Sequence, residues 1–436
     1  MLERYFKLRE NGTTVKTEVL AGISTFLTMA YIIAVNPGIL SQTGMPFEAV
    51  FVATCIAAAL GSALMGLLAN YPVALAPGMG LNAFFTFGVV FGMGHSWEIA
   101  LGCVFWSGIV FFLLSAFRVR EWIINAIPAS LKTSISVGIG LFLAIIGLQN
   151  AGIVVDNPAT LVGLGEVSST QVILTFVGFV LITALHHRGV VGSVIIGMAA
   201  VTLAGAISDV FIDGQDLVAY QGLVAMPSGV SATFLKLDIW GALEAGLYAV
   251  IFAFLFVDLF DTSGTLVATG QKAGLMDKDG KLPRLGKALM ADSSASVAGS
   301  LLGTSTTTSY IESGAGIAVG GRTGLTALIT AALFLCALFF APLAQMIPTF
   351  ATSAALIFVS VLMISAITNV QWDDLTESAP VVVTAVMMPL TYSIAEGIAL
   401  GFLTYAAVKL VSGKAREVSV SVYIIAALAL LKYIWL

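Results

Sequence analysis

Residues 73–87, VALAPGMGLNAFFTF, decide the fold, because Pro77, Gly78 and Gly80 interrupt an apolar run in mid-course. Proline and glycine both weaken a helix interior, so this run cannot form one straight helix. Residues 300–321, SLLGTSTTTSYIESGAGIAVGG, show a second interruption, with serines and threonines first and then Glu312 among small residues. We expect an extended segment leading into a half-helix in each run. Within a membrane, such backbone survives only where protein or a water-lined cavity satisfies its polar groups, so both runs predict a cavity.

The rest of the sequence places these runs in a membrane. Hydrophobic residue types supply 58% of the 436 residues and charged types 10%, whereas a soluble globular chain carries about a quarter charged residues. We therefore interpret the chain as an all-α polytopic membrane protein. Its net charge of −5, without a basic stripe, gives no indication of nucleic-acid binding. Walker A, zinc-ligand and nucleophile-elbow patterns are lacking, so we expect no enzyme, no cofactor and no metal site.

Fourteen apolar runs bounded by charge, proline or glycine are counted as transmembrane segments. They lie at about 17–36, 47–69, 73–92, 97–117, 122–148, 169–186, 189–208, 240–269, 286–303, 304–321, 323–347, 350–369, 378–392 and 393–412. A further run, 420–436, is short and contains Lys432. We expect it to lie at the membrane interface or to pack on the protein rather than to cross.

The charges between the runs predict a cytoplasmic N-terminus, because bases gather in alternate connections and the opposite connections are acidic. On the cytoplasmic side we place Arg4, Lys7, Arg9, Lys16, Arg118, Arg120, Arg188, Lys272, Lys278, Lys281, Arg284, Lys287, Arg322, Lys409, Lys414 and Arg416. On the other side lie Asp156, Glu166, Asp209, Asp213 and Asp216, with only Lys236.

The two interrupted runs are the third and the tenth, so they occupy matching places if the chain is two repeats of seven segments. Repeat one then covers about 17–208 and repeat two about 240–412, and an odd repeat length makes the copies inverted. Broken helices at matching positions are typical of secondary transporters with a midplane site. Both half-helices would point N–H donors at one ligand. The alternative is close packing of two glycine-rich helices, which the serines and threonines of run ten disfavour.

Acidic residues inside the membrane are functional candidates, because an ionisable group in hydrocarbon is costly. Asp258 and Asp261 lie three residues apart in FVDLFDTSGTL and share a helical face, and Glu312 lies in the tenth run. Neighbouring buried carboxylates cannot both ionise cheaply, so one is expected to hold a proton, which suits proton coupling. Asp292 is more simply interpreted as a helix N-cap of run nine or as bonded to a neighbouring backbone group, and Glu396 as an interfacial residue.

Four motifs on different segments resemble the AzgA-like purine permeases, a branch of the nucleobase-ascorbate transporters. They are LTMAYIIAVNP (27–37), APGMGLNAFF (76–85), FVDLFDTSGTL (256–266) and TSTTTSYIESGAGI (304–317). The resemblance implies fourteen segments in two inverted repeats, with a core domain of segments 1–4 and 8–11 and a gate domain of segments 5–7 and 12–14. It also implies a protein of the plasma membrane, the inner membrane in bacteria, that often forms a homodimer.

The resemblance further implies uptake of adenine, guanine or hypoxanthine with protons as the core moves against the gate. Glu312 matches the purine-binding acid of the tenth segment, and Asp261 and Asp258 match two acids of the eighth. Asn82 matches the polar residue of the third segment, with Gly80 and Thr28 as further contacts. The residues expected to couple transport to protons are Asp258, Asp261 and Glu312. Thr265 stands where uracil permeases carry a histidine, which favours the purine branch.

Other functions stay open at this point. An anion transporter of the sulfate-permease type would use the same broken helices, but it is expected to carry a base at the site. Sodium could replace the proton, because carboxylates, hydroxyls and unwound carbonyls also coordinate sodium. A channel or a membrane enzyme is less favoured, and the preferred purine depends on cavity geometry.

Overall fold

The computed structural model describes residues 2–117, 127–211, 217–227, 229–278 and 282–435. Five of the charged residues used to predict the orientation lie outside the described residues: Arg118, Arg120, Asp213, Asp216 and Lys281. The start of the run expected at 122–148 also lies outside them.

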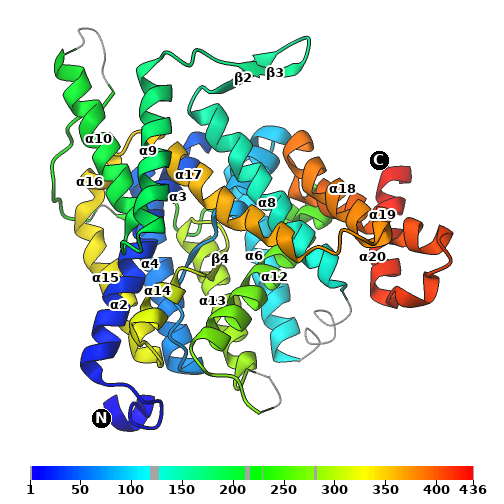
Figure 1. Cartoon of the computed structure of the whole chain (residues 1–436), viewed down its shortest axis with the longest axis horizontal. Coiled ribbons are helices and arrows are strands. Elements are labelled where there is room, and N and C mark those ends of the chain that lie inside the picture. The colour runs from blue at the N-terminus through cyan, green and yellow to red at the C-terminus, as the bar shows by residue number, and fades with distance from the viewer. Residues whose placement is uncertain (1, 118–126, 212–216, 228, 279–281, 436) are drawn as a thin grey trace.

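The described chain is almost entirely helical, and its helices pack in two groups (Figure 1). The first group contains α2 (Val15–Met29), α3 (Ile32–Leu40), α4 (Phe47–Leu64), α5 (Met79–Ala83), α6 (Trp97–Ala116), α12 (Tyr248–Lys272), α13 (Leu285–Leu302), α14 (Ser313–Val319) and α15 (Gly324–Ala337). The second contains α8 (Ala129–Asn150), α9 (Thr170–His187), α10 (Ser193–Phe211), α17 (Thr349–Ile364), α18 (Leu375–Thr391), α19 (Ile394–Val411) and α20 (Val420–Trp435). Shorter helices are α1 (Leu2–Phe6), α11 (Ile239–Glu244) and α16 (Ala341–Gln345).

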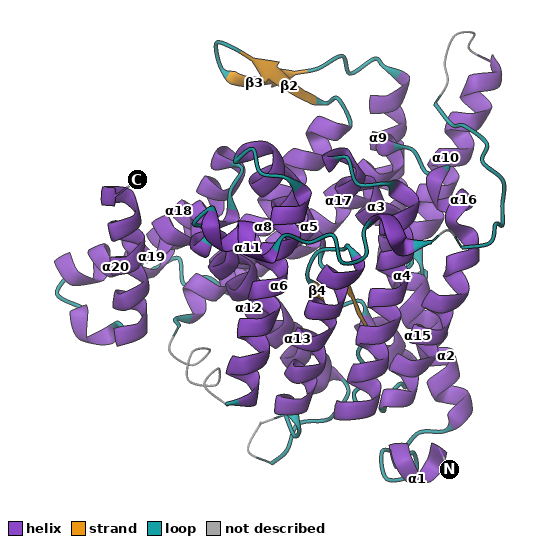
Figure 2. Cartoon of the chain, turned by 180° about the vertical axis from the view of Figure 1, so that it is seen from behind, coloured by secondary structure: helices purple, strands orange, loops and turns teal. Residues whose placement is uncertain are grey.

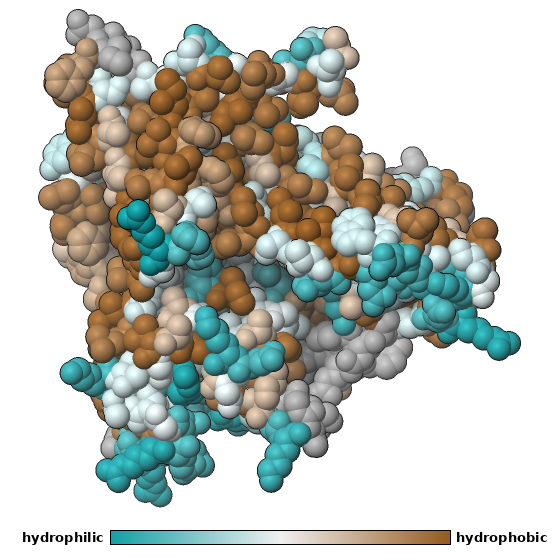
Figure 3. Space-filling view, in the orientation of Figure 1, coloured by the Kyte–Doolittle hydropathy of each residue, from teal (hydrophilic) through white to brown (hydrophobic). Residues whose placement is uncertain are grey.

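Ten helices in the described part of the chain are long and apolar enough to cross a membrane. They coincide with ten of the fourteen expected runs. The other four runs, at 73–92, 286–303, 304–321 and 378–392, hold shorter or more polar helices. Figure 3 shows apolar side chains over much of the face viewed, with hydrophilic ones gathered at the N-terminal end and beside the C-terminal helices. The protein is therefore an all-helical membrane protein with about ten apolar spans, and the count of fourteen stays a prediction.

The extended stretches predicted in the third and tenth runs are present. Strand β1 (Leu75–Pro77) pairs antiparallel with β4 (Thr307–Ser309), with Ala76 opposite Thr308, and both views place β4 in the middle of the helical body (Figure 2). Helix α5 follows β1 and continues as a π-helix over Phe84–Gly92. Helix α14 follows β4. The close pairing needs a small residue beside the strands, because a Cβ on Gly78 would lie 2.8 Å from Thr308 Cγ2. A second strand pair, β2 (Val154–Asn157) with β3 (Leu161–Leu164), lies outside the helical body (Figure 2).

A buried acid joins the first helix to the second half of the chain. Glu18 on α2 is fully buried, and its carboxylate accepts hydrogen bonds from the main-chain N–H groups of Arg322 (2.9 Å), Thr323 (3.3 Å) and Thr326 (3.1 Å). The hydroxyl of Thr326 donates a fourth bond at 2.6 Å. The first N–H groups of a helix have no partner within it, so Glu18 satisfies the start of α15.

Helix α20 packs antiparallel on α19. Whether the run at 420–436 crosses the membrane is not decided by this packing, so its placement stays a prediction. The hydroxyl of Tyr423 donates to the carbonyl of Ala415 at 3.2 Å, just after α19 ends. Near the other end of α20, the hydroxyl of Tyr433 bonds to Glu396 in the first turn of α19. The two helices thus run side by side over most of the length of α19.

Candidate functional site

A partly open cavity lies where the two strand–helix units meet α12, α8 and α17. The empty space among its lining residues, open mouth included, is about 560 Å³. Its lining residues are Gly78, Met79, Gly80, Leu81, Ile139, Val257, Asp261, Thr265, Thr308, Ser309, Tyr310, Ile311, Glu312, Val359 and Met363. The cavity predicted from the two interrupted runs is therefore present.

The polar lining of this cavity comes from one group of helices. Asp261 and Thr265 belong to α12, and Thr308 to Glu312 form β4 and the turn into α14. The second group contributes Ile139 from α8 with Val359 and Met363 from α17, all of them apolar. A ligand in the cavity can therefore hydrogen-bond to the first group and makes apolar contacts with the second.

Two carboxyl groups face the cavity. Glu312 immediately precedes α14, and its Oε1 accepts a 2.6 Å hydrogen bond from the hydroxyl of Tyr31, which fixes the carboxylate from behind. Asp261 lies on α12, and its Oδ2 is 3.5 Å from the hydroxyl of Thr308. Oδ2 and the Glu312 carboxylate thus leave acceptor positions for a ligand that carries N–H groups.

The two half-helices differ in what their first turns offer. In α5 the first ladder bond runs from Asn82 N–H to Gly78 O at 2.9 Å, so the N–H groups of Met79, Gly80 and Leu81 precede the ladder and lie at the cavity. In α14 the N–H groups of Ser313, Gly314 and Ala315 already donate to carbonyls three residues earlier. Main-chain donors at the α14 end stay a prediction, because Ile311 and Glu312 precede these bonds and also line the cavity.

Three uncharged residues were expected to contact the ligand: Gly80, Thr28 and Asn82. Of these, Gly80 belongs to the cavity lining. A Cβ there would lie 2.3 Å from Ile139 Cγ2, so this glycine lets α5 approach α8. Thr28 lies behind the cavity, with its hydroxyl bonded to the carbonyl of Thr25 at 2.8 Å and within 3.4 Å of the carbonyl of Glu312. Asn82 is fully buried and bonds through its side-chain oxygen to Ser305.

The remaining acids lie deeper. Asp258 is fully buried, and its Oδ2 is 3.1 Å from the hydroxyl of Ser296 on α13. Asp292 does not cap a helix, contrary to expectation, because α13 begins at Leu285 and Asp292 lies in its interior. Its Oδ1 accepts bonds from Thr262 (2.9 Å) and Ser309 (3.0 Å). Of the two acids on α12, Asp261 faces the cavity and Asp258 faces α13.

Two tyrosines escaped the sequence argument. Tyr31 holds Glu312, and Tyr310 lines the cavity and donates from its hydroxyl to the carbonyl of Pro77 at 2.5 Å, which ties β4 to β1. Both stand among apolar or small residues, and a buried tyrosine hydroxyl usually finds a hydrogen-bond partner. A tyrosine inside an apolar membrane run is therefore the signal that could have pointed to both.

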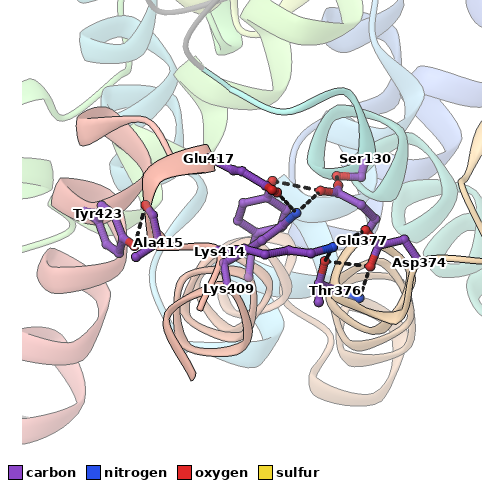
Figure 4. Close-up of polar contacts among 10 residues, drawn as sticks. Ser130, Asp374, Thr376, Glu377, Lys409, Lys414, Ala415, Glu417 and Tyr423 are labelled. Carbon is purple, nitrogen blue, oxygen red and sulfur yellow. Dashed lines mark hydrogen bonds and ion pairs between the residues drawn. The ribbon is translucent and has the colours of Figure 1, made fainter. Parts of the chain in front are cut away.

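A second charged cluster lies away from the cavity, where α8, α18 and α19 meet (Figure 4). Lys409 is almost fully buried, and its ammonium contacts Glu377 (2.6 Å) and Glu417 (2.8 Å). Glu377 also accepts a 2.5 Å bond from Ser130. Beside it, Lys414 donates to Asp374 at 2.7 Å. The hydrogen bond from Lys414 holds the pKa of the Asp374 carboxyl well below its usual range. The cluster joins the ends of three helices and is complete without a ligand.

Comparisons with known proteins agree with this architecture. A family model described as "Permease family" matches residues 16–400. The adenine permease AdeP of Escherichia coli is 51% identical over 437 residues, covering 100% of this chain and 96% of that protein. The guanine/hypoxanthine permease PbuO of Bacillus subtilis is 45% identical and covers 97% of this chain and 98% of that protein.

Solved structures show the same fold at low identity. The transmembrane domain of the bicarbonate transporter BicA from a cyanobacterium superimposes with a TM-score of 0.66 at 16% identity, covering 88% of this chain and 96% of that domain. The structure of SLC26A9 gives a TM-score of 0.65 at 11% identity, covering 94% of this chain and 66% of that one.

Proposed function

Because this chain belongs to the Permease family and is a transporter rather than an enzyme, we propose that it imports purine nucleobases by proton symport. The substrate is adenine, guanine or hypoxanthine, the purines named for the relatives AdeP and PbuO. The protein lies in the plasma membrane, the inner membrane in bacteria, with its N-terminus in the cytoplasm. The positive charge of the N-terminal and Lys272 to Lys287 segments supports this orientation.

One observation carries the proposal: the carboxylates of Asp261 and Glu312 face the same cavity as the main-chain N–H groups at the start of α5. A purine has N–H groups on one part of its edge and ring nitrogen or carbonyl acceptors on another. The carboxylates accept from the former and the N–H groups of Met79 to Leu81 donate to the latter. Ile139, Val359 and Met363 then cover the apolar faces of the base.

The arrangement of the cavity supports a moving core. We assign the first group of helices to a core domain, segments 1–4 and 8–11, and the second to a gate domain, segments 5–7 and 12–14. The fourteen segments form two inverted repeats, about 17–208 and 240–412, and the gate domain joins two copies in a homodimer. Because the polar lining lies on the first group, the core carries the purine with its hydrogen bonds intact while it slides along the apolar gate wall.

Protons couple to this movement through the acids of the core. Two ionised carboxylates at one cavity repel each other, so a proton on Asp261 or Glu312 lowers the charge that must move with the purine. Asp258 extends the set of proton-binding groups behind the cavity. Sodium is the alternative coupling ion, since the same oxygens would suit it.

The anion-transporter alternative shares the fold, as the similarity to BicA and SLC26A9 makes plain. Among the described residues that line the cavity, however, the ionisable side chains are the two acids and a tyrosine, with no base to neutralise an anion. The composition of the lining therefore favours a neutral substrate rich in N–H groups over sulfate or bicarbonate.

The experiment is uptake of radiolabelled adenine, guanine and hypoxanthine into proteoliposomes with an imposed proton gradient. In parallel reactions a protonophore is added, a sodium gradient replaces the proton gradient, or excess unlabelled sulfate or uracil is added as a competitor. Accumulation that collapses with the protonophore and is blocked only by purines supports the proposal. Uptake of sulfate without uptake of any purine under either gradient refutes it. Purine uptake driven only by the sodium gradient would identify sodium, rather than the proton, as the coupling ion.

A further inference from the structure

A row of side-chain oxygens leads from the cavity to a buried acid. Asp261 Oδ2 at the cavity lies 3.5 Å from Thr308 Oγ1, which lies 2.8 Å from Thr262 Oγ1. Thr262 Oγ1 in turn lies 2.9 Å from Oδ1 of Asp292. Thr262 and Asp292 are fully buried, and neither lines the cavity, whereas Asp261 and Thr308 do.

Each threonine hydroxyl has a single proton, so this row has a direction. If Asp292 is ionised, Thr262 donates to it, Thr308 donates to Thr262, and a protonated Asp261 is the only member left to donate to Thr308. If Asp261 is ionised, every bond reverses, and Asp292 holds the proton. The same four residues therefore accommodate one shared proton in two states that differ only in which carboxyl group carries it.

The surroundings of Asp292 favour a carboxyl group that takes up and releases a proton. Its Oδ2 is buried and has no hydrogen-bond partner among the described residues, so a permanent negative charge there lacks compensation. The other titratable groups of this region are Asp258 on α12, Glu312 and Tyr310 beside β4, and Tyr31 after α2. None of these groups carries a positive charge that would hold Asp292 ionised.

We propose that Thr262 and Thr308 form a proton wire through which Asp261 and Asp292 exchange one proton in each transport cycle. The proposal rests on proton symport as the function of the cavity. In the inward step the O–H bond of Asp261 breaks and one forms on Thr308, whose own proton passes to Thr262, and the proton of Thr262 passes to Asp292. One proton moves, no electrons are transferred, and both hydroxyls are regenerated with reversed orientation.

The contact between Thr308 and Asp261, at the cavity end of the wire, is the longest of its three contacts. The Thr308–Asp261 separation of 3.5 Å exceeds the 2.5–3.0 Å of an ordinary O–H···O bond, whereas the two inner links at 2.8 and 2.9 Å are complete. Such hydrogen bonds often tighten only when substrate binds. A purine that bonds to Asp261 repositions this carboxylate against Thr308, so loading of the cavity and proton exchange with Asp292 become linked.

Thr262→Val tests the wire, because valine keeps the shape of threonine and lacks the hydroxyl. Thr269→Val is the matched control: it makes the same change two helical turns away on α12, at a buried residue outside the wire whose hydroxyl donates to the carbonyl of Thr265 at 2.6 Å. Thr262→Ser restores the hydroxyl. In proteoliposomes, accumulation driven by a proton gradient requires proton release, whereas counterflow of labelled against unlabelled purine does not. We expect Thr262→Val to lose accumulation by about tenfold or more while keeping counterflow, with both retained in Thr269→Val and Thr262→Ser.

A second measurement does not need transport. Infrared spectroscopy of the purified protein follows hydrogen–deuterium exchange of the Asp292 carboxyl group, identified as the C=O band that Asp292→Asn removes. The wire predicts exchange slowed by about tenfold or more in Thr262→Val and unchanged in Thr269→Val. Native exchange and native accumulation in Thr262→Val overturn the proposal. If the native protein fails to accumulate purine but exchange slows as predicted, symport is refuted as the function and the wire is retained.

Discussion

Replacing Glu312 with glutamine tests the cavity most directly, because the change keeps the volume of the side chain and removes its charge. In the structure, Glu312 Oε1 is held by Tyr31 at 2.6 Å, and the glutamine oxygen can accept the same bond. Folding is therefore expected to survive. The substitution changes the acceptor of the hydrogen bond that the purine donates, from a charged carboxylate to a neutral amide oxygen.

The size of the effect follows from the nature of that bond. A hydrogen bond to a charged partner contributes about 1.5–3 kcal/mol and a neutral one about 1 kcal/mol. Glu312→Gln is thus expected to weaken purine binding by about 0.5–2 kcal/mol, roughly two- to thirtyfold in Kd. Glu312→Ala removes the whole bond and leaves Tyr31 without its acceptor, so its loss of affinity is expected to reach about tenfold to 150-fold.

The assay is equilibrium binding of labelled purine to purified protein, with the thermal midpoint of each variant recorded to confirm folding. Glu396→Gln is the matched control, because Glu396 is an acid at the start of α19 bonded to Tyr433 rather than to the cavity. Tyr31→Phe is expected to weaken binding less than Glu312→Ala, since it frees the carboxylate without removing it. Native affinity in folded Glu312→Gln and Glu312→Ala would exclude Glu312 from the binding site.

Three further changes test the framework, each by thermal unfolding of the purified protein. Glu18→Ala leaves the N–H groups of Arg322 and Thr323, just before α15, without an acceptor and is expected to cost on the order of 3 kcal/mol; an unchanged midpoint contradicts the capping role. Lys409→Met leaves Glu377 as an unpaired, largely buried charge and should destabilise by roughly 3–5 kcal/mol, whereas the double variant with Glu377→Gln should be more stable than the single one. The hydrogen bond from Lys414 lowers the pKa of Asp374, so Asp374 stabilises the fold above about pH 4 and loses this effect as the pH falls. The midpoints of the native protein and Asp374→Asn should converge in acid, and a constant difference would refute the pairing.

The sequence predicted the break points because proline and glycine act locally. Pro77 and Gly78 end β1, and the serines and threonines before Glu312 form β4, where both were expected. The pairing of the strands could not be read in the same way, since Ala76 and Thr308 meet across more than half of the chain. Register between distant segments depends on packing, which no local pattern encodes.

The site shows the same division. Asp261, Glu312 and Gly80 were expected from sequence and lie at the cavity, and their roles in binding stay predictions. Asp292 was misplaced as a cap because its helix begins seven residues earlier than the acid, at Leu285, and helix starts are the least certain feature of a polar run. Glu18 was overlooked because its partners, the N–H groups of α15, are contributed by the other half of the chain.

These long-range contacts support the proposal that the cavity moves as a unit. Glu18 joins α2 to α15, Tyr310 joins β4 to Pro77, and Tyr31 joins the first segment to Glu312, so each half of the chain completes a polar group of the other. Separating the two halves would expose several buried donors at once, at about 1–3 kcal/mol each. The wall formed by Ile139, Val359 and Met363 offers apolar contacts instead, which have no preferred register and can re-form after a displacement. The least costly motion therefore keeps the strand pair, both half-helices and α12 together, and slides them as one body against α8 and α17.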